Sequence, residues 1–425
     1  MLSRKHKILL CIIVGISQIE YGALLSLTPA FYPTVAESIG ATASQYGFVF
    51  GISNLAGFIA GPVFGKFGNR IGVHWMLKLG SLIQGIAGAL FGFLVYITDT
   101  TLFIALSYLL RFLHGVSSVA AWASVNTMLI FIFPKDASKV VASIEVLQGL
   151  GYMIGPMLGS LIYEYGGFLA TFLSTGLVGI VLSVLLIVVI PTGKYDKLDD
   201  ENYNDRDKCP TSTLGLTDIF KSPKILFPFV DNMICFVGTG MMEAMLEPYM
   251  INEVYGTHID VGITFMIYAL TYIIGSLVAG QLCKTSGYAM MASVIGNGMM
   301  GIAFTFFGPV PFIPINPKPW LIQVAIAVTG VAYSFVMVST FVRARLEVIK
   351  EGYRDSIETN LLISSMWSVS FYLGNFLGPT IGGLLVDYFD FPWTAFTFSI
   401  VYIIMTFIDF GIGITSSKKT ILYIN

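Results

Sequence analysis

Long apolar stretches recur along the whole chain and are separated by short polar or glycine-rich segments. Each stretch is near or above the ~20 residues that cross a bilayer as a helix, whereas the strands of a membrane barrel are about half as long and alternate in polarity. The windows run over about 8–32, 45–67, 75–97, 102–131, 138–162, 168–190, 225–250, 261–283, 288–307, 320–342, 358–386 and 393–414. This pattern predicts an all-α polytopic membrane protein with twelve transmembrane helices.

Composition agrees with the hydropathy pattern and excludes several functions. The chain is 55% hydrophobic and only 11% charged, and its mean hydropathy of +0.79 lies far outside the range of soluble proteins. The net charge of −2 gives no indication of a nucleic-acid partner. The four cysteines suggest neither a disulfide framework nor a metal site. We find no nucleophile and base constellation, so we expect neither an enzyme nor a cofactor.

A single long polar stretch, 191–223, divides six windows from six and is expected to be a flexible linker. We therefore expect two six-helix halves, 1–190 and 224–415, followed by a tail, 416–425. GYMIGPMLGSLIYEYGGF (151–168) matches GNFLGPTIGGLLVDYFDF (374–391) at a constant numbering offset of 223, and elsewhere the offset is nearer 215. Halves repeated in the same orientation are expected to bind substrate near the membrane midplane between them.

Lys and Arg indicate the orientation of the chain. With Arg111 set aside as intramembrane, they fall on alternate sides of successive windows, and the opposite loops carry Lys318 alone. The positive-inside rule then places both termini and the 191–223 loop in the cytoplasm. The basic start and apolar run at the N-terminus predict a first span rather than a cleaved signal peptide.

Glu20 is the most unusual charge, because it lies about 18 Å along the first apolar window if that window is helical. An ionisable group at such a depth costs at least ~2.5–3.5 kcal/mol, so it is expected to face a cavity or a partner. Burial favours the protonated form of a carboxyl group, while an ammonium group favours the charged form. We therefore expect Glu20 to hold either a proton or a cation and to face the half that carries Glu243 and Glu247. The alternative is a protonated or snorkelling glutamate at a helix interface.

Other intramembrane charges give weaker candidates. Glu243 and Glu247 are four residues apart and share a helix face, although Glu247 could be a wetted residue at a helix end. Arg111 and Glu145 lie on adjacent windows, either as a pair that gates proton movement or as a structural clamp. Two further acids, Asp231 and Asp409, are expected to be interface residues rather than functional ones.

Three motifs resemble those of the major facilitator superfamily along essentially the whole chain. They are GPVFGKFGNRIG (61–72), with Asn69 where the superfamily usually has Asp, RFLHG (111–115), and the Gly-x-x-x-Gly-Pro-x-x-Gly element after Gly151, which in that superfamily is characteristic of proton-coupled antiporters. The residues assigned to conformational motifs are Gly65, Asn69, Arg70, Gly72, Gly151, Gly155, Pro156, Gly159, Gly374, Gly378, Pro379 and Gly382. The glycines also have a structural reading, close helix packing, with Pro156 and Pro379 as kinks. The Asn69-Arg70 loop could latch the cytoplasmic side or merely supply positive-inside charge.

A narrower resemblance is to the vesicular amine transporter branch, whose members exchange luminal protons for cytosolic organic cations. It is carried by NRIG (69–72), GSLIYE (159–164), AMLEP (244–248) and FPW (391–393), and it is strongest toward the polyamine-transporting member through GPVP (308–311). By that resemblance Glu20 falls where monoamine transporters place an amine-binding aspartate. Ser339, Ser368 and Ser53 replace two acids and a lysine of those relatives, which argues against a monoamine or acetylcholine substrate.

These observations favour a proton-coupled antiporter of organic cations that works by alternating access, with polyamines or related amines as substrates. The alternatives are a multidrug-type proton antiporter, a carrier of another small solute, or a sensor or scaffold that does not transport. The expected partners are the small cation, protons and the lipid bilayer, with the proton gradient as driving force and the monomer as the functional unit. A secretory or synaptic-type vesicle and the plasma membrane are both expected locations.

Overall fold

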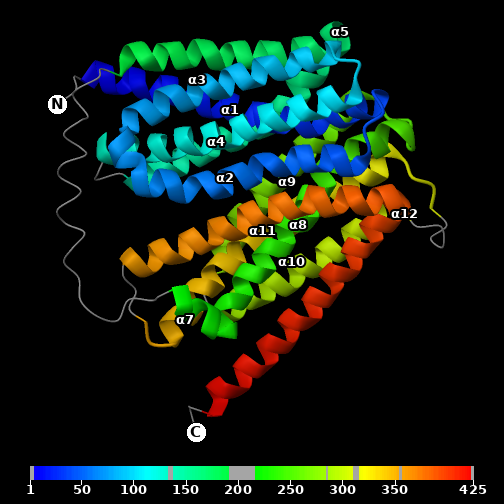
Figure 1. The fold of residues 1–425 in the computed structure, drawn as a ribbon. Coiled ribbons are helices and arrows are strands. Elements are labelled where there is room, and N and C mark those ends of the chain that lie inside the picture. Colours follow the sequence, from blue (N-terminus) through cyan, green and yellow to red (C-terminus); the bar gives the residue numbers. More distant parts are fainter. Residues whose placement is uncertain are drawn as a thin grey trace. The chain divides into compact units, whose positions relative to one another are not determined.

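The computed structural model describes residues 4–132, 137–190, 216–283, 286–309, 315–353 and 357–422. Within these ranges every element is helical (Figure 1), which confirms the predicted all-α class. The elements are α1 (Arg4–Ser38), α2 (Ala43–Ile71), α3 (Val73–Gly92), η1 (Phe93–Tyr96), α4 (Thr100–Ile132), α5 (Ala137–Val189), α7 (Leu216–Lys221), α8 (Pro223–Asn252), α9 (His258–Leu282), α10 (Ser286–Phe307), α11 (Pro319–Lys350) and α12 (Ile357–Leu422).

Ten of the described helices are long and apolar enough to cross a membrane, and two of these are long enough to cross it twice. α5 is interrupted at Gly167 (φ 64°, ψ −167°) and α12 at Asp390 (φ 64°, ψ 167°). Each interruption separates two apolar segments, so the helices are consistent with the twelve predicted windows. The polypeptide is an integral, multi-pass membrane protein.

The two interruptions are equivalent positions of the internal repeat, because Gly167 and Asp390 are related by the same numbering offset as the matched motif. In both, the threonine four residues later donates its hydroxyl to the carbonyl of the interrupting residue, at 3.0 Å for Thr171 and 2.8 Å for Thr394. The backbone is helical through Pro156 and Pro379, eleven residues earlier in each case. The breaks therefore lie at Gly167 and Asp390, inside the gaps between the predicted windows, and the predicted kinks at Pro156 and Pro379 stay predictions.

The chain divides into two compact units, Met1–Pro210 with Thr257–Met266, and Thr211–Gly256 with Ile267–Asn425. The predicted linker, 191–223, lies outside the described residues as far as residue 215. Its last part forms α7, where Ile219 is fully buried in an apolar cluster with Ile225, Phe229 and Val348. α12 extends to Leu422, past residue 415, where we ended the predicted C-terminal half.

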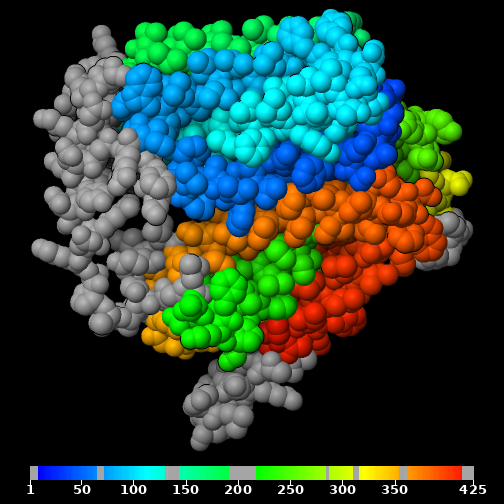
Figure 2. Space-filling model, in the orientation of Figure 1, coloured from blue at the N-terminus to red at the C-terminus, as the bar shows by residue number. Residues whose placement is uncertain are grey.

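In the N-terminal unit, α1 packs against the first segment of α5 through the glycines of the repeated motif. Gly151 faces the backbone of Ile19, Gly155 faces Ala23, and Gly159 faces Leu27, each so closely that a β-carbon would clash. Small residues at such a spacing let two helices approach closely within a membrane. Figure 2 shows the side chains of α2, α3 and α4 filling the spaces between their ribbons on the visible face.

The C-terminal unit repeats this contact between α8 and the first segment of α12. Gly374 faces Met233, Gly378 faces Val237, and Gly382 faces Met241. Ile19 and Met233 thus take corresponding places in the two units, because each lies against the first glycine of its motif. By this correspondence Glu20 matches Ile234, so Glu20 and Glu243 are not equivalent positions of the repeat.

Candidate functional site

Glu20 lies in the middle of α1, and its side chain points into a cavity of about 20 Å³ inside the N-terminal unit. The residue is only 8% exposed. Four helices of the same unit, α1, α3, α4 and α5, line the cavity with Ser17, Gln18, Tyr21, Ser81, Gln84, Ser118, Ala121, Trp122, Gly179 and Ser183. We expected Glu20 to face the half that carries Glu243 and Glu247, but its carboxylate lies within its own helix bundle.

The lining of this cavity is polar, and two of its acceptor atoms lack a hydrogen-bond partner. The buried Oε1 atoms of Glu20 and Gln18 have no hydrogen-bond partner among the described residues. A buried acceptor without a hydrogen bond raises the free energy of the folded protein. A proton on the carboxyl group of Glu20, or an ammonium ion beside it, removes this penalty there. A cavity of about this volume holds about one water molecule, so this conformation fits a proton or a water rather than an organic cation.

Arg111 is buried on α4, one of the four helices that line the cavity, and its guanidinium contacts hydroxyl groups. Its Nη2 donates to Ser53 Oγ at 3.2 Å, and its Nη1 lies 3.4 Å from Thr28 Oγ1. One turn later His114 stacks on Tyr21, a residue of the cavity lining, with ring centroids 6.4 Å apart. The side chain of Glu145 lies outside the described part of the chain, so the predicted Arg111–Glu145 pair stays a prediction.

Glu243 and Glu247 lie on one face of α8 in the C-terminal unit. Glu247 is fully buried and Glu243 is half-buried. Their depth therefore fits an intramembrane role, but they belong to a different unit from Glu20.

The motif at 61–72 ends α2 and begins α3. The side chains of residues 65–70, which include Gly65, Asn69 and Arg70, lie outside the described part. Gly72 has φ 90° and precedes α3, a backbone conformation that side chains other than glycine rarely adopt. The glycine is thus required for the turn, while the latch role of Asn69 and Arg70 stays a prediction.

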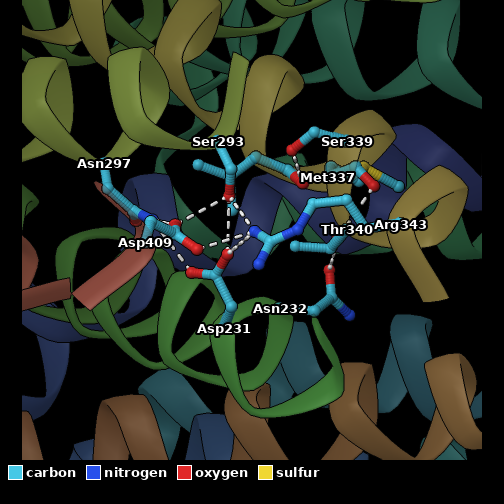
Figure 3. A network of polar contacts seen from close by, with 10 residues as sticks. Asp231, Asn232, Ser293, Asn297, Met337, Ser339, Thr340, Arg343 and Asp409 are labelled. Carbon is cyan, nitrogen blue, oxygen red and sulfur yellow. Dashed lines mark hydrogen bonds and ion pairs between the residues drawn. The ribbon is translucent and has the colours of Figure 1, made fainter. Parts of the chain in front are cut away.

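A second buried polar site lies in the C-terminal unit, and sequence reasoning missed its central residue. Arg343 was counted with the cytoplasmic charges, but it is 3% exposed and lies between three helices (Figure 3). Its Nη1 lies 2.7 Å from Asp409 Oδ1 and 3.3 Å from Asp231 Oδ2. Ser293 and Asn297 of α10 complete the group, which we call the Arg343 network: Asp231, Ser293, Asn297, Arg343 and Asp409.

Asp231 and Asp409 are interface residues as predicted, since they join α8 and α12 to α10 and α11. The signal that could have found Arg343 is its position, because it lies one residue beyond the predicted window 320–342 on a helix that continues to Lys350. A charge at the end of an apolar window is ambiguous between the membrane surface and the protein interior, and only the packing distinguishes them.

Comparisons with known proteins agree with this architecture. The sequence model of the Major Facilitator Superfamily matches residues 10–352. The mouse "MFS-type transporter SLC18B1" is 27% identical over 387 residues, which cover 90% of this chain and 82% of that protein. The mouse "Synaptic vesicular amine transporter" is 25% identical over 389 residues, which cover 88% and 67%.

Solved structures share the fold at low sequence identity. The nucleoside transporter NupG superposes with a TM-score of 0.72 at 15% identity, over 96% of this chain and 98% of that one. A bacterial homolog of the human lysosomal transporter Spinster, in an inward-facing and occupied conformation, gives 0.72 at 10% identity over 98% of each chain. Sequence match and structural neighbours together indicate a transporter rather than an enzyme.

Proposed function

Because the chain belongs to the major facilitator superfamily, and is therefore a transporter, we propose that it exchanges protons for organic cations, with polyamines or related amines as substrates. The observation that carries this proposal is the buried carboxylate of Glu20, whose Oε1 has no hydrogen-bond partner among the described residues. The amine class rests on the relatives, one of which is described as a vesicular amine transporter.

The proposed mechanism is a competition at Glu20. A carboxylate in the interior of a helix bundle is stabilised by a proton or by a nearby cation, and it does not hold both comfortably. We take the site to be open to one side of the membrane at a time. Release of a proton on one side then favours capture of a cation there, and release of the cation on the other side favours capture of a proton. Rocking of two repeated halves is the usual source of such alternation in this fold.

The small cavity fits one step of this cycle. About 20 Å³ is enough for the proton-loaded carboxyl group and not for an organic cation. Cation binding then requires helices α1, α3, α4 and α5 to separate around Glu20, or the cation to approach from the Tyr21 side of the helix. Glu243 and Glu247 are proposed as further carboxylates for a multiply charged amine, and Arg111 with Glu145 as a pair that assists proton movement.

The same proposal includes orientation and location. Lys and Arg on alternate loops support cytoplasmic termini. The relatives support a secretory-type vesicle, where an acidic lumen supplies protons, although the plasma membrane also fits. The functional unit is proposed to be a monomer.

A second candidate is a proton antiporter of lipophilic cations or of another small solute. Ser339 and Ser368 favour it, since they stand where the amine-transporting relatives carry acids by the resemblance described above. Uptake into proteoliposomes with an acid interior separates the candidates, with labelled spermidine, serotonin or a lipophilic cationic dye supplied outside.

The proposal predicts that at least one amine accumulates and that accumulation stops when the proton gradient is dissipated. Accumulation of the dye alone supports the second candidate. Failure of every cation to accumulate, or accumulation that ignores the gradient, overturns the exchanger.

A further inference from the structure

We propose that the Arg343 network is a second proton-binding site, in which Asp231 and Asp409 share one bound proton. The inference extends the proposed function, since the proton of this site would be exchanged in addition to the one at Glu20. The network is separate from Glu20, because it lies in the C-terminal unit and is built from α8, α10, α11 and α12.

The charges of the network do not balance without an added proton. Asp231 and Asp409 are both 0% exposed and Arg343 is 3% exposed. The described residues place no second basic side chain within ion-pair distance of either carboxylate. Two ionised aspartates with one guanidinium leave a net negative charge in the interior of a membrane-spanning bundle, which is strongly unfavourable. One proton on either carboxyl group makes the network neutral.

Hydrogen-bond counting leads to the same conclusion. Ser293 Oγ lies 2.7 Å from Asp231 Oδ2 and 2.9 Å from Asp409 Oδ2, and it accepts from Arg343 Nη1 at 2.8 Å. A serine hydroxyl carries a single proton, so it donates to only one of the two carboxylates. The other short oxygen–oxygen contact is a hydrogen bond only if that carboxyl group is protonated and donates to Ser293 (Figure 3).

The nitrogen atoms that face the two carboxylates, Asn297 Nδ2 and Arg343 Nη1, direct all their protons at network acceptors. Asn297 Nδ2 donates its two protons to Asp231 Oδ1 at 2.9 Å and Asp409 Oδ2 at 3.0 Å. Arg343 Nη1 has two protons for three acceptors, Asp409 Oδ1, Ser293 Oγ and the more distant Asp231 Oδ2. The remaining acceptor, Asn297 Oδ1, is buried without a partner among the described residues. The acceptors thus outnumber the protons directed at them, and a carboxyl proton adds a donor at Ser293.

The titratable neighbours of the network carry no positive charge. Cys235 of α8 lies one turn after Asp231, and Tyr402 of α12 donates to the Cys235 carbonyl at 3.1 Å. The remaining face of the Arg343 guanidinium lies over the ring of Phe227, 5.6 Å from its centre. Cys235 and Tyr402 therefore cannot neutralise the second aspartate, and Phe227 closes off the guanidinium.

The N-terminal unit shows that the fold does not require this network. Gly115 of α4 faces Ser53 as Gly330 of α11 faces Tyr268, so these two helices correspond in the repeat. The correspondence between α4 and α11 pairs Arg343 with Met128. The offset of the matched motif, continued along α12, pairs Asp409 with Leu186. Both Met128 and Leu186 lie in an apolar core cluster. Uncharged side chains thus fill these two positions in the N-terminal unit, so the fold itself does not require an ion pair there, and we assign the charged version to proton binding.

Infrared spectroscopy of the purified chain, without substrate or gradient, tests the site directly. Protein labelled with ¹³C at the aspartate carboxyl groups should show a protonated-carboxyl C=O band at neutral pH that the label shifts. Glutamates do not contribute to the labelled band, so Glu20, Glu243 and Glu247 are silent. We expect Asp409→Asn or Asp231→Asn to abolish the band, and Asp387→Asn, an exposed position on the same helix α12, to leave it.

Ser293→Ala gives a second variant that changes no charge. It removes the shared hydroxyl, so the band should shift to higher frequency as the carboxyl group loses its partner. Absence of a labelled protonated-carboxyl band in the unaltered protein overturns the proposal. A band that persists in both Asn variants, or one that Ser293→Ala leaves unmoved, also overturns it.

Transport measurements then separate this inference from the proposed function. If uptake is proton-driven, Asp409→Asn should lower the number of protons exchanged per cation by one relative to Asp387→Asn. If the unaltered protein shows no proton-driven uptake, the exchanger proposal fails while the infrared result on the bound proton stands.

Discussion

Gly179 of α5 leaves the space that the carboxylate of Glu20 occupies in the N-terminal unit. A β-carbon on residue 179 would lie 2.8 Å from Glu20 Oε1 and 3.1 Å from its carboxyl carbon. The equivalent pair in the C-terminal unit is Ile234 and Tyr402, where the tyrosine packs closely against Gly238 and donates to the Cys235 carbonyl. Tyr402 thus fills in the C-terminal unit the space that Gly179 leaves open in the N-terminal unit, and of these two positions only that of Glu20 holds a carboxylate.

Gly179→Ala should therefore displace the Glu20 side chain. Overpacking of this kind costs about 1–3 kcal/mol in well-packed interiors. We expect a lower melting temperature in detergent and weaker gradient-driven uptake. A double-mutant cycle with Glu20→Ala checks the cause, because the shortened side chain leaves room for the added methyl group. If Gly179→Ala is equally harmful in both backgrounds, the contact with Glu20 is not what makes this glycine necessary.

Glu20→Gln should uncouple transport from the proton gradient. Glutamine has nearly the same shape as glutamate, but its amide does not take up a proton. Cation accumulation should therefore become insensitive to the gradient while the chain still folds. Uptake in proteoliposomes with and without a dissipating ionophore measures this. Glu164→Gln, an exposed glutamate of the same unit, serves as the matched control. Proton-driven uptake that survives Glu20→Gln would remove this residue from the mechanism.

Gly151→Ala should separate α1 from the first segment of α5. A β-carbon there clashes with the backbone of Ile19, which cannot move as a flexible side chain can. We expect a loss of about 1–3 kcal/mol. Gly149→Ala, two residues earlier on the same helix, is the control, because its β-carbon meets nothing within 4 Å. The melting temperatures of the two variants should differ clearly, and equal values would count against packing as the reason for this motif.

Arg343→Gln should destabilise the C-terminal unit strongly. Removing one partner of a buried ion pair typically costs about 3–5 kcal/mol, because the other charge is left uncompensated. Adding Asp409→Asn should restore part of the loss. Arg345→Gln, at an exposed position on the same helix, is the comparison. Thermal unfolding in detergent measures all of these variants, and similar melting temperatures for the 343 and 345 variants would show that the network contributes little.

Several features of the fold could be predicted because they depend on local pattern. Apolar windows of membrane-spanning length predict helices, because the backbone N–H and C=O groups of a segment inside the bilayer must hydrogen-bond to one another. The repeated motif predicted equivalent segments, and the glycines after Gly151 and Gly374 predicted close packing. The helix breaks were also placed, since Gly167 and Asp390 lie in the gaps 163–167 and 387–392 between predicted windows.

The candidate site divides in the same manner. That Glu20 lies deep in a spanning helix could be predicted from the sequence, because depth follows from distance along an apolar run. The direction of its carboxylate could not, since it depends on the space left by Gly179, far along the chain. The grouping of Arg343 with Asp231 and Asp409 likewise becomes visible only in the packed protein. Side chains on four helices meet only after packing, and the charge of a single residue does not indicate its partners.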